Sequence, residues 1–332
     1  RLTVFARFRP EIRFITLWTT GLMALAWSVG EMTPDLLMLL VMMLLFDQIV
    51  RLGDALPYGR VIAIGLLGGA GYLVKPFGLL FFIAIWSVVC AYIWARNRDA
   101  VSLLHVAQRW GLGLVAFLAL VLPWALVLTW KYGHFTIGTS GRLNLTLVAP
   151  PGWPGPSSGP PARSFAEPPF PGSVVGLDPS LSTAPTWNPL ASVDDMMHLA
   201  RNVQNNVSDV IHHFALVGLV GLCVMTIALM GIVRARASVP ELCVRATIFA
   251  ALYVGMYCLV LVNTRYIWPA ILIMCIAGFS LVNAWSLGNR LPRWTYAAVA
   301  LPLALSMVIG PDWRPGMGVG RATIDAMYAP NA

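Results

Sequence analysis

The chain has 332 residues, of which 58% are hydrophobic and only 11% are charged, and its formal net charge is +8. Soluble domains carry about a quarter charged residues, so this composition excludes a soluble globular protein and indicates an integral membrane protein. The cations lie in short loops between apolar runs. This pattern is typical of the positive-inside rule, and it argues against a nucleic-acid partner.

Apolar runs of about 20 residues cross a bilayer as helices. Nine such runs predict an all-α polytopic membrane protein, with five spans in residues 1–130 and four in residues 211–310. The predicted spans are residues 13–30, 34–50, 61–74, 77–94, 111–130, 211–233, 246–263, 266–286 and 295–310. The third run is short, and its glycines predict close approach of neighbouring helices; they are Gly65, Gly68, Gly69 and Gly71.

The Lys and Arg residues predict the orientation of the chain. If residues 1–13 are cytoplasmic, most of the 22 cations fall in short loops on the cytoplasmic side. The positive-inside rule therefore places the N-terminus inside, and the segments 131–210 and 311–332 outside the cytoplasm. The sequence begins with Arg1, and no signal peptide precedes the first apolar run. We therefore expect a fragment that lacks its natural N-terminus and whose external tail, residues 311–332, is also truncated.

Residues 131–210 form one large polar segment between the fifth and sixth predicted spans. Half of the 24 prolines lie between Pro150 and Pro189. Such density excludes a helix or a central strand there and predicts an irregular loop. After the prolines, residues 193–213 predict a helix, because acidic residues occupy its first turn. One side of this helix is partly apolar, as in helices that lie against a membrane surface.

Two carboxylates are predicted at the outer boundary of the membrane, Glu31 and Asp35. A carboxylate at this place would bind a metal or a sugar hydroxyl, or would act as a general base, so both are candidate catalytic residues. A structural interpretation of Asp35 is equally open. The residue would lie in the first turn of a helix that starts at Pro34, where negative charge is favoured.

Two cations, Lys75 and Arg265, are predicted at the same boundary, on the side opposite most other cations. A cation at a membrane boundary is costly without an anionic partner, and in a chain this hydrophobic the obvious anion is a lipid phosphate. Arginine suits a bidentate phosphate contact and lysine supplies a point charge. The alternatives are a snorkelling lysine and an interfacial anchor formed by Arg265 with the aromatic Tyr266 and Trp268.

The remaining candidates carry weaker signals. Arg142 and Asn144 would line a sugar or acceptor site, or would belong to an ordinary turn-rich exit from the membrane. The five cysteines are assigned to packing, and they show no metal-ligand spacing. Cys243 and Arg245 are expected in a short basic loop before the seventh predicted span. The sequence lacks the motifs of ATP hydrolysis, serine hydrolysis and zinc chemistry. It indicates no certain cofactor, and it leaves open whether a divalent metal takes part.

Three segments together resemble the membrane glycosyltransferases of the GT-C type: residues 31–37, 68–76 and 264–269. Within that type they are most similar to glycosyltransferase family 39 and the RgtA-like group, the bacterial relatives of protein O-mannosyltransferases and aminoarabinose transferases. The resemblance spans most of residues 13–286. It implies a GT-C-like fold and an inverting transfer of a sugar from a polyprenyl-phosphate donor to a lipid, glycan or protein acceptor outside the cytoplasm, in the bacterial inner membrane.

The resemblance also implies roles for residues. Asp35 matches the second acidic position of the family, and Lys75 and Arg265, with Tyr266, match groups near the donor phosphate. The principal acidic residue of the family lies in a first external loop that this sequence does not contain. Two other functions stay open: a transporter or flippase of an anionic lipid or solute, which would use the same cations for binding, and a polysaccharide polymerase.

Overall fold

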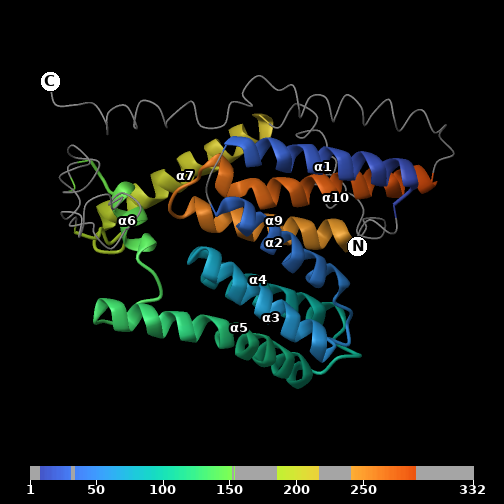
Figure 1. Ribbon diagram of the computed structural model, residues 1–332, viewed down its shortest axis with the longest axis horizontal. Coiled ribbons are helices and arrows are strands. Elements are labelled where there is room, and N and C mark those ends of the chain that lie inside the picture. The colour runs from blue at the N-terminus through green and yellow to red at the C-terminus, as the bar shows by residue number, and fades with distance from the viewer. Residues whose placement is uncertain (1–7, 31–33, 152, 154–184, 217–240, 289–332) are drawn as a thin grey trace. The chain divides into compact units, whose positions relative to one another are not determined.

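The structure, a computed structural model, describes residues 8–30, 34–151, 153, 185–216 and 241–288. In these ranges it is helical and contains no strand (Figure 1). Three of the described helices are long and apolar enough to cross a membrane: α4 (Phe77–Arg96), α5 (Leu103–Tyr132) and α9 (Glu241–Cys258). The described part of the chain is therefore all-helical and has the character of a membrane protein.

The other helices complete the described part of the chain. They are α1 (Pro10–Gly30), α2 (Asp35–Arg51), α3 (Tyr58–Val74), α6 (Ser140–Leu147), α7 (Val193–Leu216), the short 3-10 helix η5 (Thr264–Ile267) and α10 (Trp268–Gly288). The helix α7 coincides with the helix expected over residues 193–213. Its position at a membrane surface stays a prediction.

The first five predicted spans each coincide with one helix, α1 to α5, although α5 begins well before residue 111. The seventh prediction was displaced, because α9 begins at Glu241 and ends at Cys258, where residues 246–263 were expected. The eighth coincides with α10 and the η5 turn before it. Residues 217–233 and 295–310 lie outside the described part, so the number of nine spans stays a prediction.

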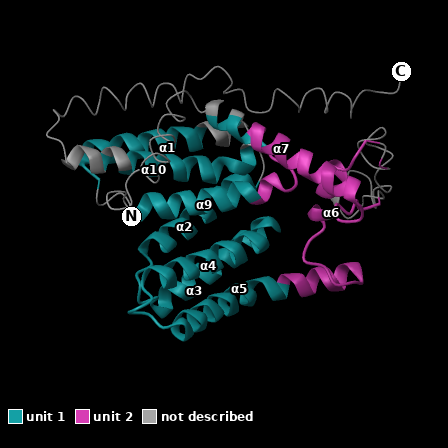
Figure 2. Ribbon diagram, turned by 180° about the vertical axis from the view of Figure 1, so that it is seen from behind, with its two compact units in different colours: residues 1–123, 210–255, 263–313 teal, residues 124–209, 256–262, 314–332 magenta. Residues whose placement is uncertain are grey.

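The chain divides into two compact units, each of which is described by itself (Figure 2). Unit 1 comprises residues 1–123, 210–255 and 263–313, and unit 2 comprises residues 124–209, 256–262 and 314–332. The first boundary falls at Pro123 inside α5. A proline inside a helix removes one backbone hydrogen bond, so this is a natural place for the packing partners of α5 to change.

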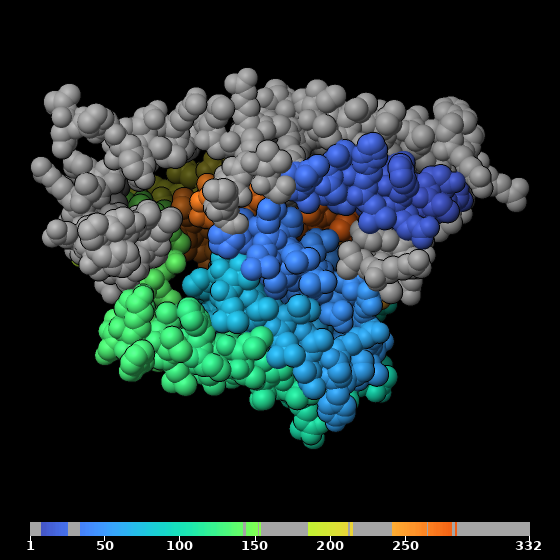
Figure 3. All heavy atoms as spheres, viewed as in Figure 1, coloured from blue at the N-terminus to red at the C-terminus, as the bar shows by residue number. Residues whose placement is uncertain are grey.

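The surface of α5 is strongly apolar. The spheres of α5, teal to green, are visible at the surface in Figure 3. Its exposed large side chains include Val115, Leu118, Leu122, Trp124, Leu126, Val127 and Trp130. A soluble protein rarely exposes so continuous an apolar surface, because each side chain loses the free energy of burial. Exposure to lipid removes this cost, which agrees with the length and composition of α5.

Prolines set the beginnings of the first four helices. Pro10 is the first residue of α1, and Pro34, Pro57 and Pro76 directly precede α2, α3 and α4. The first N–H groups of a helix have no intrahelical acceptor, so a proline at this place costs no hydrogen bond. Only Lys75 and Pro76 separate α3 from α4. The chain therefore reverses within two residues, and Lys75 lies at that corner.

Glycines allow α3 to approach its neighbours closely, as the sequence predicted. A Cβ atom added to Gly69 would lie 2.9 Å from Leu120 Cβ, and one added to Gly71 would lie 2.8 Å from Met42 Cε. A Cβ atom added to Gly78 in α4 would meet backbone alone, 2.4 Å from the Gly71 carbonyl carbon and 2.6 Å from its oxygen. Backbone cannot yield as a flexible side chain does, so this contact requires glycine.

Replacement of Gly78 by alanine is therefore expected to lower the free energy of unfolding by about 1–3 kcal/mol, because the methyl group would separate α3 from α4. Gly111→Ala is the matched control, since an added Cβ there meets nothing within 4 Å. That helical substitution should be neutral or stabilising by up to about 1 kcal/mol. Thermal unfolding of the purified protein in detergent measures both, and equal midpoints for the two variants would contradict the packing at Gly78.

Aromatic side chains join α2, α4 and α9 inside unit 1. Phe81 of α4 contacts both Phe249 and Tyr253 of α9, each with ring centroids 5.0 Å apart in edge-to-face geometry. Phe46 of α2 packs on Phe249 at 5.5 Å. All four rings are buried. Edge-to-face pairs stabilise a protein beyond the burial of apolar area. These aromatic contacts therefore hold α2, α4 and α9 together.

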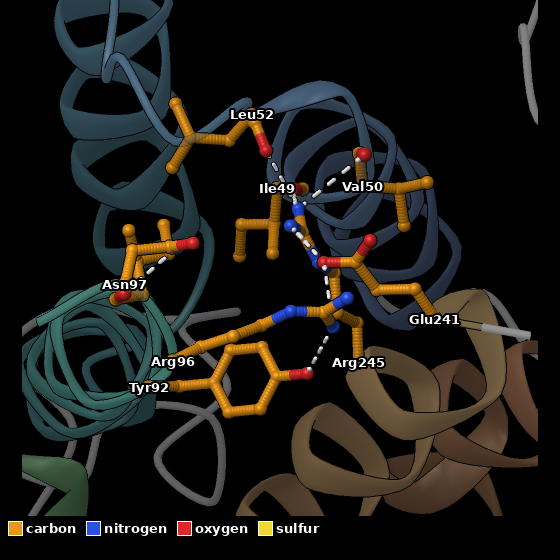
Figure 4. Close-up of polar contacts among 9 residues, drawn as sticks. Ile49, Val50, Leu52, Tyr92, Arg96, Asn97, Glu241 and Arg245 are labelled. Carbon is orange, nitrogen blue, oxygen red and sulfur yellow. Dashed lines mark hydrogen bonds and ion pairs between the residues drawn. The ribbon is translucent and has the colours of Figure 1, made fainter. Parts of the chain in front are cut away.

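The carboxyl end of α2 is held by Arg245 of α9 (Figure 4). The guanidinium is 8% exposed; it donates to the carbonyl oxygens of Ile49 and Leu52, the latter at 2.8 Å, and to Glu241 Oε1 at 2.6 Å. The last carbonyls of a helix have no intrahelical donor, and a cation near them is favoured by the helix dipole. Arg245 was predicted to lie in a basic loop, which is wrong: these carbonyls satisfy it inside a helix.

Unit 2 is organised around α7. Asn202 Nδ2 donates to the Val148 carbonyl at 2.8 Å, and Asn206 Nδ2 donates to the Cys258 carbonyl at 2.9 Å. Asn206 therefore satisfies a carbonyl at the end of α9, which explains why α9 stops at Cys258 rather than near residue 263. Ser192 and Asp195 form a reciprocal cap at the start of α7, through bonds of 2.6 and 3.1 Å.

Candidate functional site

Three elements of unit 1 bring the predicted charged residues together. Asp35 is the first residue of α2, Lys75 ends α3, and Arg265 lies in η5, just before α10. Lys75 precedes Pro76, which favours extended backbone, and its φ of −148° and ψ of 133° are extended. Asn263 caps η5, because its side chain accepts a hydrogen bond from the Arg265 N–H at 3.2 Å.

The two cations contact the two oxygens of one carboxylate. Lys75 Nζ donates to Asp35 Oδ1, and Arg265 Nε lies 3.7 Å from Asp35 Oδ2. The Asp35 side chain is 3% exposed, whereas those of Lys75 and Arg265 are 18% and 30% exposed. The carboxylate therefore lies beneath, and the cations face outward. The structure confirms that these three residues lie together, while their roles stay predictions.

Tyr266 forms an aromatic wall beside the cations. The Lys75 ammonium nitrogen lies over its ring, 4.3 Å from the centroid, and the Arg265 guanidinium carbon lies 5.4 Å from the same centroid. The negative face of an aromatic ring attracts a cation, and the attraction strengthens where water is scarce. Tyr266 thus contacts both of the cations that lie beside the Asp35 carboxylate. We call these four residues the cation–carboxylate cluster: Asp35, Lys75, Arg265 and Tyr266.

The four described side chains of the cation–carboxylate cluster include two cations and one carboxylate. Burial lowers the pKa of Lys75 below its ordinary value, while its hydrogen bond to Asp35 and the Asp35 charge raise it and the Arg265 charge lowers it further. Removal of water costs a lone ammonium a great deal, and a second anion would relieve that cost. A small anion at the exposed side of the cations would therefore be stabilised by both of them.

The structure agrees with the structural interpretation of Asp35, whereas its catalytic role stays a prediction. Asp35 begins α2, as the structural interpretation predicted, and no side-chain cap precedes it at Pro34. It also pairs with Lys75 and lies beside Arg265. The Lys75 ammonium pairs with this buried carboxylate, and the snorkelling interpretation of Lys75 stays a prediction.

The other predicted site residues are Glu31, Arg142 and Asn144. Glu31 is outside the described residues. Arg142 and Asn144 belong to α6 in unit 2, and the Arg142 side chain is also outside the described part. Because each unit stands by itself, no contact between these two residues and the cation–carboxylate cluster is described. The turn-rich interpretation holds for residues 133–139, which form turns and bends, whereas residues 140–147 form a helix that was not expected.

The described residues hold no group of three or more His, Cys, Asp or Glu side chains placed to bind a metal ion. The four described cysteines, Cys90, Cys243, Cys258 and Cys275, are buried. Cys243 was expected in a loop but lies in α9, where it is buried. Cys223 lies outside the described residues.

No protein-family model, curated protein or solved structure matches this chain. The functional argument therefore depends on the cation–carboxylate cluster itself. Two features of unit 1 escaped the sequence analysis. Asn263 gave a usable signal, because an asparagine directly before a helical turn is a common cap. Arg245 gave none, since its backbone partners lie on α2, far away along the chain.

Proposed function

We propose that the protein is a membrane glycosyltransferase, which moves a sugar from a polyprenyl-phosphate donor to an acceptor hydroxyl on the non-cytoplasmic side of a bacterial inner membrane. The observation that supports the proposal most is the cation–carboxylate cluster. Two outward cations suit an anionic headgroup, and the carboxylate between them suits a proton acceptor. The apolar helices around the cluster suit a lipid-borne donor.

In the proposed reaction, the acceptor oxygen attacks the anomeric carbon and forms the new glycosidic bond. The bond between that carbon and the phosphate oxygen breaks, and its electron pair leaves with the polyprenyl phosphate. Asp35 accepts the hydroxyl proton. Lys75 and Arg265 stabilise the negative charge that builds on the departing phosphate. Each such preorganised contact lowers the free energy of the transition state by about 3 kcal/mol.

Loss of either cation should therefore slow transfer. We expect Lys75→Ala and Arg265→Ala each to lower transfer at least about tenfold, because each removes one stabilising charge from the departing phosphate. The measurement is transfer of a labelled sugar by the full-length protein in proteoliposomes, with released polyprenyl phosphate counted as the second product.

Arg109→Ala is the matched control for these variants. Its guanidinium also lies over a tyrosine ring, 3.4 Å from the centroid of Tyr58, but in a different part of unit 1. Transfer by this variant should stay at the wild-type rate. Wild-type rates for both cluster variants would contradict the proposal. Movement of the intact donor across the membrane, with no polyprenyl phosphate released, would indicate a transporter, and long glycan products would indicate a polymerase.

A further inference from the structure

We propose that Asp35 is a displaceable internal anion: an incoming phosphate takes its place on Lys75 and Arg265, and this exchange frees its carboxylate for the acceptor. The inference deepens the proposed function, and it rests on that function for the nature of the acceptor. The exchange itself requires only an anionic phosphate group and the four side chains of the cation–carboxylate cluster.

The first observation is that the carboxylate is closed in the structure. Lys75 covers one of its oxygens, Arg265 lies beside the other, and only 3% of the side chain is exposed. A general base must come within about 2.6–3.2 Å of the group whose proton it accepts. An acceptor hydroxyl therefore reaches Asp35 only after at least one cation has moved away from it.

The second observation is the direction from which an anion would approach. Lys75 and Arg265 are 18% and 30% exposed, so an anion from outside meets the cations before it meets the carboxylate. The phosphodiester of a sugar-bearing donor carries one negative charge, as a carboxylate does, and its two non-bridging oxygens suit the forked guanidinium. The phosphate monoester that departs carries up to one further charge. Both phosphates would therefore compete with Asp35 for the ammonium and the guanidinium.

The third observation is that Lys75 has a second stabilising neighbour. Its nitrogen lies 4.3 Å from the centre of the Tyr266 ring, whose face attracts cations. The ammonium would thus keep one favourable contact while it exchanges one anion for the other. Tyr266 acts here as a positioning residue, because it contacts the cations and not the reacting atoms.

The exchange has a measurable consequence for affinity. In the free protein only a fraction of molecules have Lys75 and Arg265 released from Asp35, and the apparent affinity for a phosphate ligand is reduced by that fraction. Removal of the Asp35 charge should remove this competition. The exchange also predicts an order of binding: the donor binds before the acceptor, because the donor phosphate uncovers the Asp35 carboxylate.

The test is binding of farnesyl phosphate, a short polyprenyl phosphate, to the full chain in nanodiscs of uncharged lipid. We expect Asp35→Asn to bind this probe about tenfold more tightly than the wild type, since the competing anion is gone. Asp35→Glu keeps the charge, so its affinity should stay close to that of the wild type. Inorganic phosphate, measured in parallel, separates recognition of the phosphate group alone from recognition of a lipid phosphate.

Asp47→Asn is the matched control. Asp47 is a buried carboxylate at the other end of α2 and pairs with Arg51 at 2.7 Å, so its loss should leave the affinity unchanged. Equal or weaker binding by a folded Asp35→Asn protein would overturn the exchange. If the wild type nevertheless transfers sugar, the proposed function survives that result. If Asp35→Asn binds more tightly but no variant transfers sugar, the exchange stands and the transferase fails.

Discussion

Asp35→Asn is expected to lower the rate of sugar transfer by about 10²–10⁴-fold, the usual contribution of a general base. Asparagine has nearly the same shape as aspartate and still accepts a hydrogen bond from Lys75, but it cannot accept the acceptor's proton. The loss should appear in kcat, while the KM for the donor falls because the cations have lost their internal competitor. Steady-state transfer kinetics in proteoliposomes, at saturating acceptor, measure both constants.

Two further variants make this result interpretable. Asp47→Asn removes the other buried carboxylate of α2, about 18 Å away by the helical rise of about 1.5 Å per residue, and should keep the wild-type rate. Asp35→Glu retains a base in a displaced position and should recover part of the lost rate. If Asp35→Asn keeps the wild-type kcat, the proton acceptor is another group, and Glu31 becomes the first residue to replace.

The sequence predicted the cation–carboxylate cluster because the signals involved are local. Pro34 and Pro76 mark the starts of α2 and α4, so the positions of Asp35 and Lys75 follow from helix boundaries alone. Alternation of the predicted spans then assigns both residues, and Arg265, to one side of the membrane. Side-chain detail does not follow from such reasoning. The contact of both cations with Tyr266 depends on how η5 packs against its neighbours.

Other features of the fold depended on distant partners. Hydropathy placed Arg245 in a loop, because a charged residue lowers the mean of any window that contains it. In the structure, backbone carbonyls of α2 satisfy its guanidinium, so α9 begins before it. The helix α6 was missed because its sequence, from Ser140 to Leu147, is short and polar. Helix propensity alone does not predict so short a helix.

Arg245→Met is expected to lower the free energy of unfolding by about 3–5 kcal/mol, because the buried carbonyls of Ile49 and Leu52 each lose a charged donor, at about 1.5–3 kcal/mol per bond. Methionine fills most of the space of the aliphatic stem but donates no hydrogen bond. The free energy of unfolding of Arg245→Lys should lie between those of the wild type and Arg245→Met, since one ammonium cannot reproduce the fork of a guanidinium. Chemical or thermal unfolding in detergent provides the comparison.

Arg98→Met is the control for that series. Arg98 is exposed and lies over Trp94, 4.7 Å from the ring centroid, so its replacement should change the free energy of unfolding by no more than about 0.5 kcal/mol. Arg245 contacts the carboxyl end of α2, whereas Asp35 lies at the amino end of that helix. The fraction of Arg245→Met protein that remains folded should therefore transfer sugar at the wild-type rate. A normal melting midpoint for Arg245→Met would show that water or other donors satisfy these carbonyls, and the end of α2 would then need no arginine.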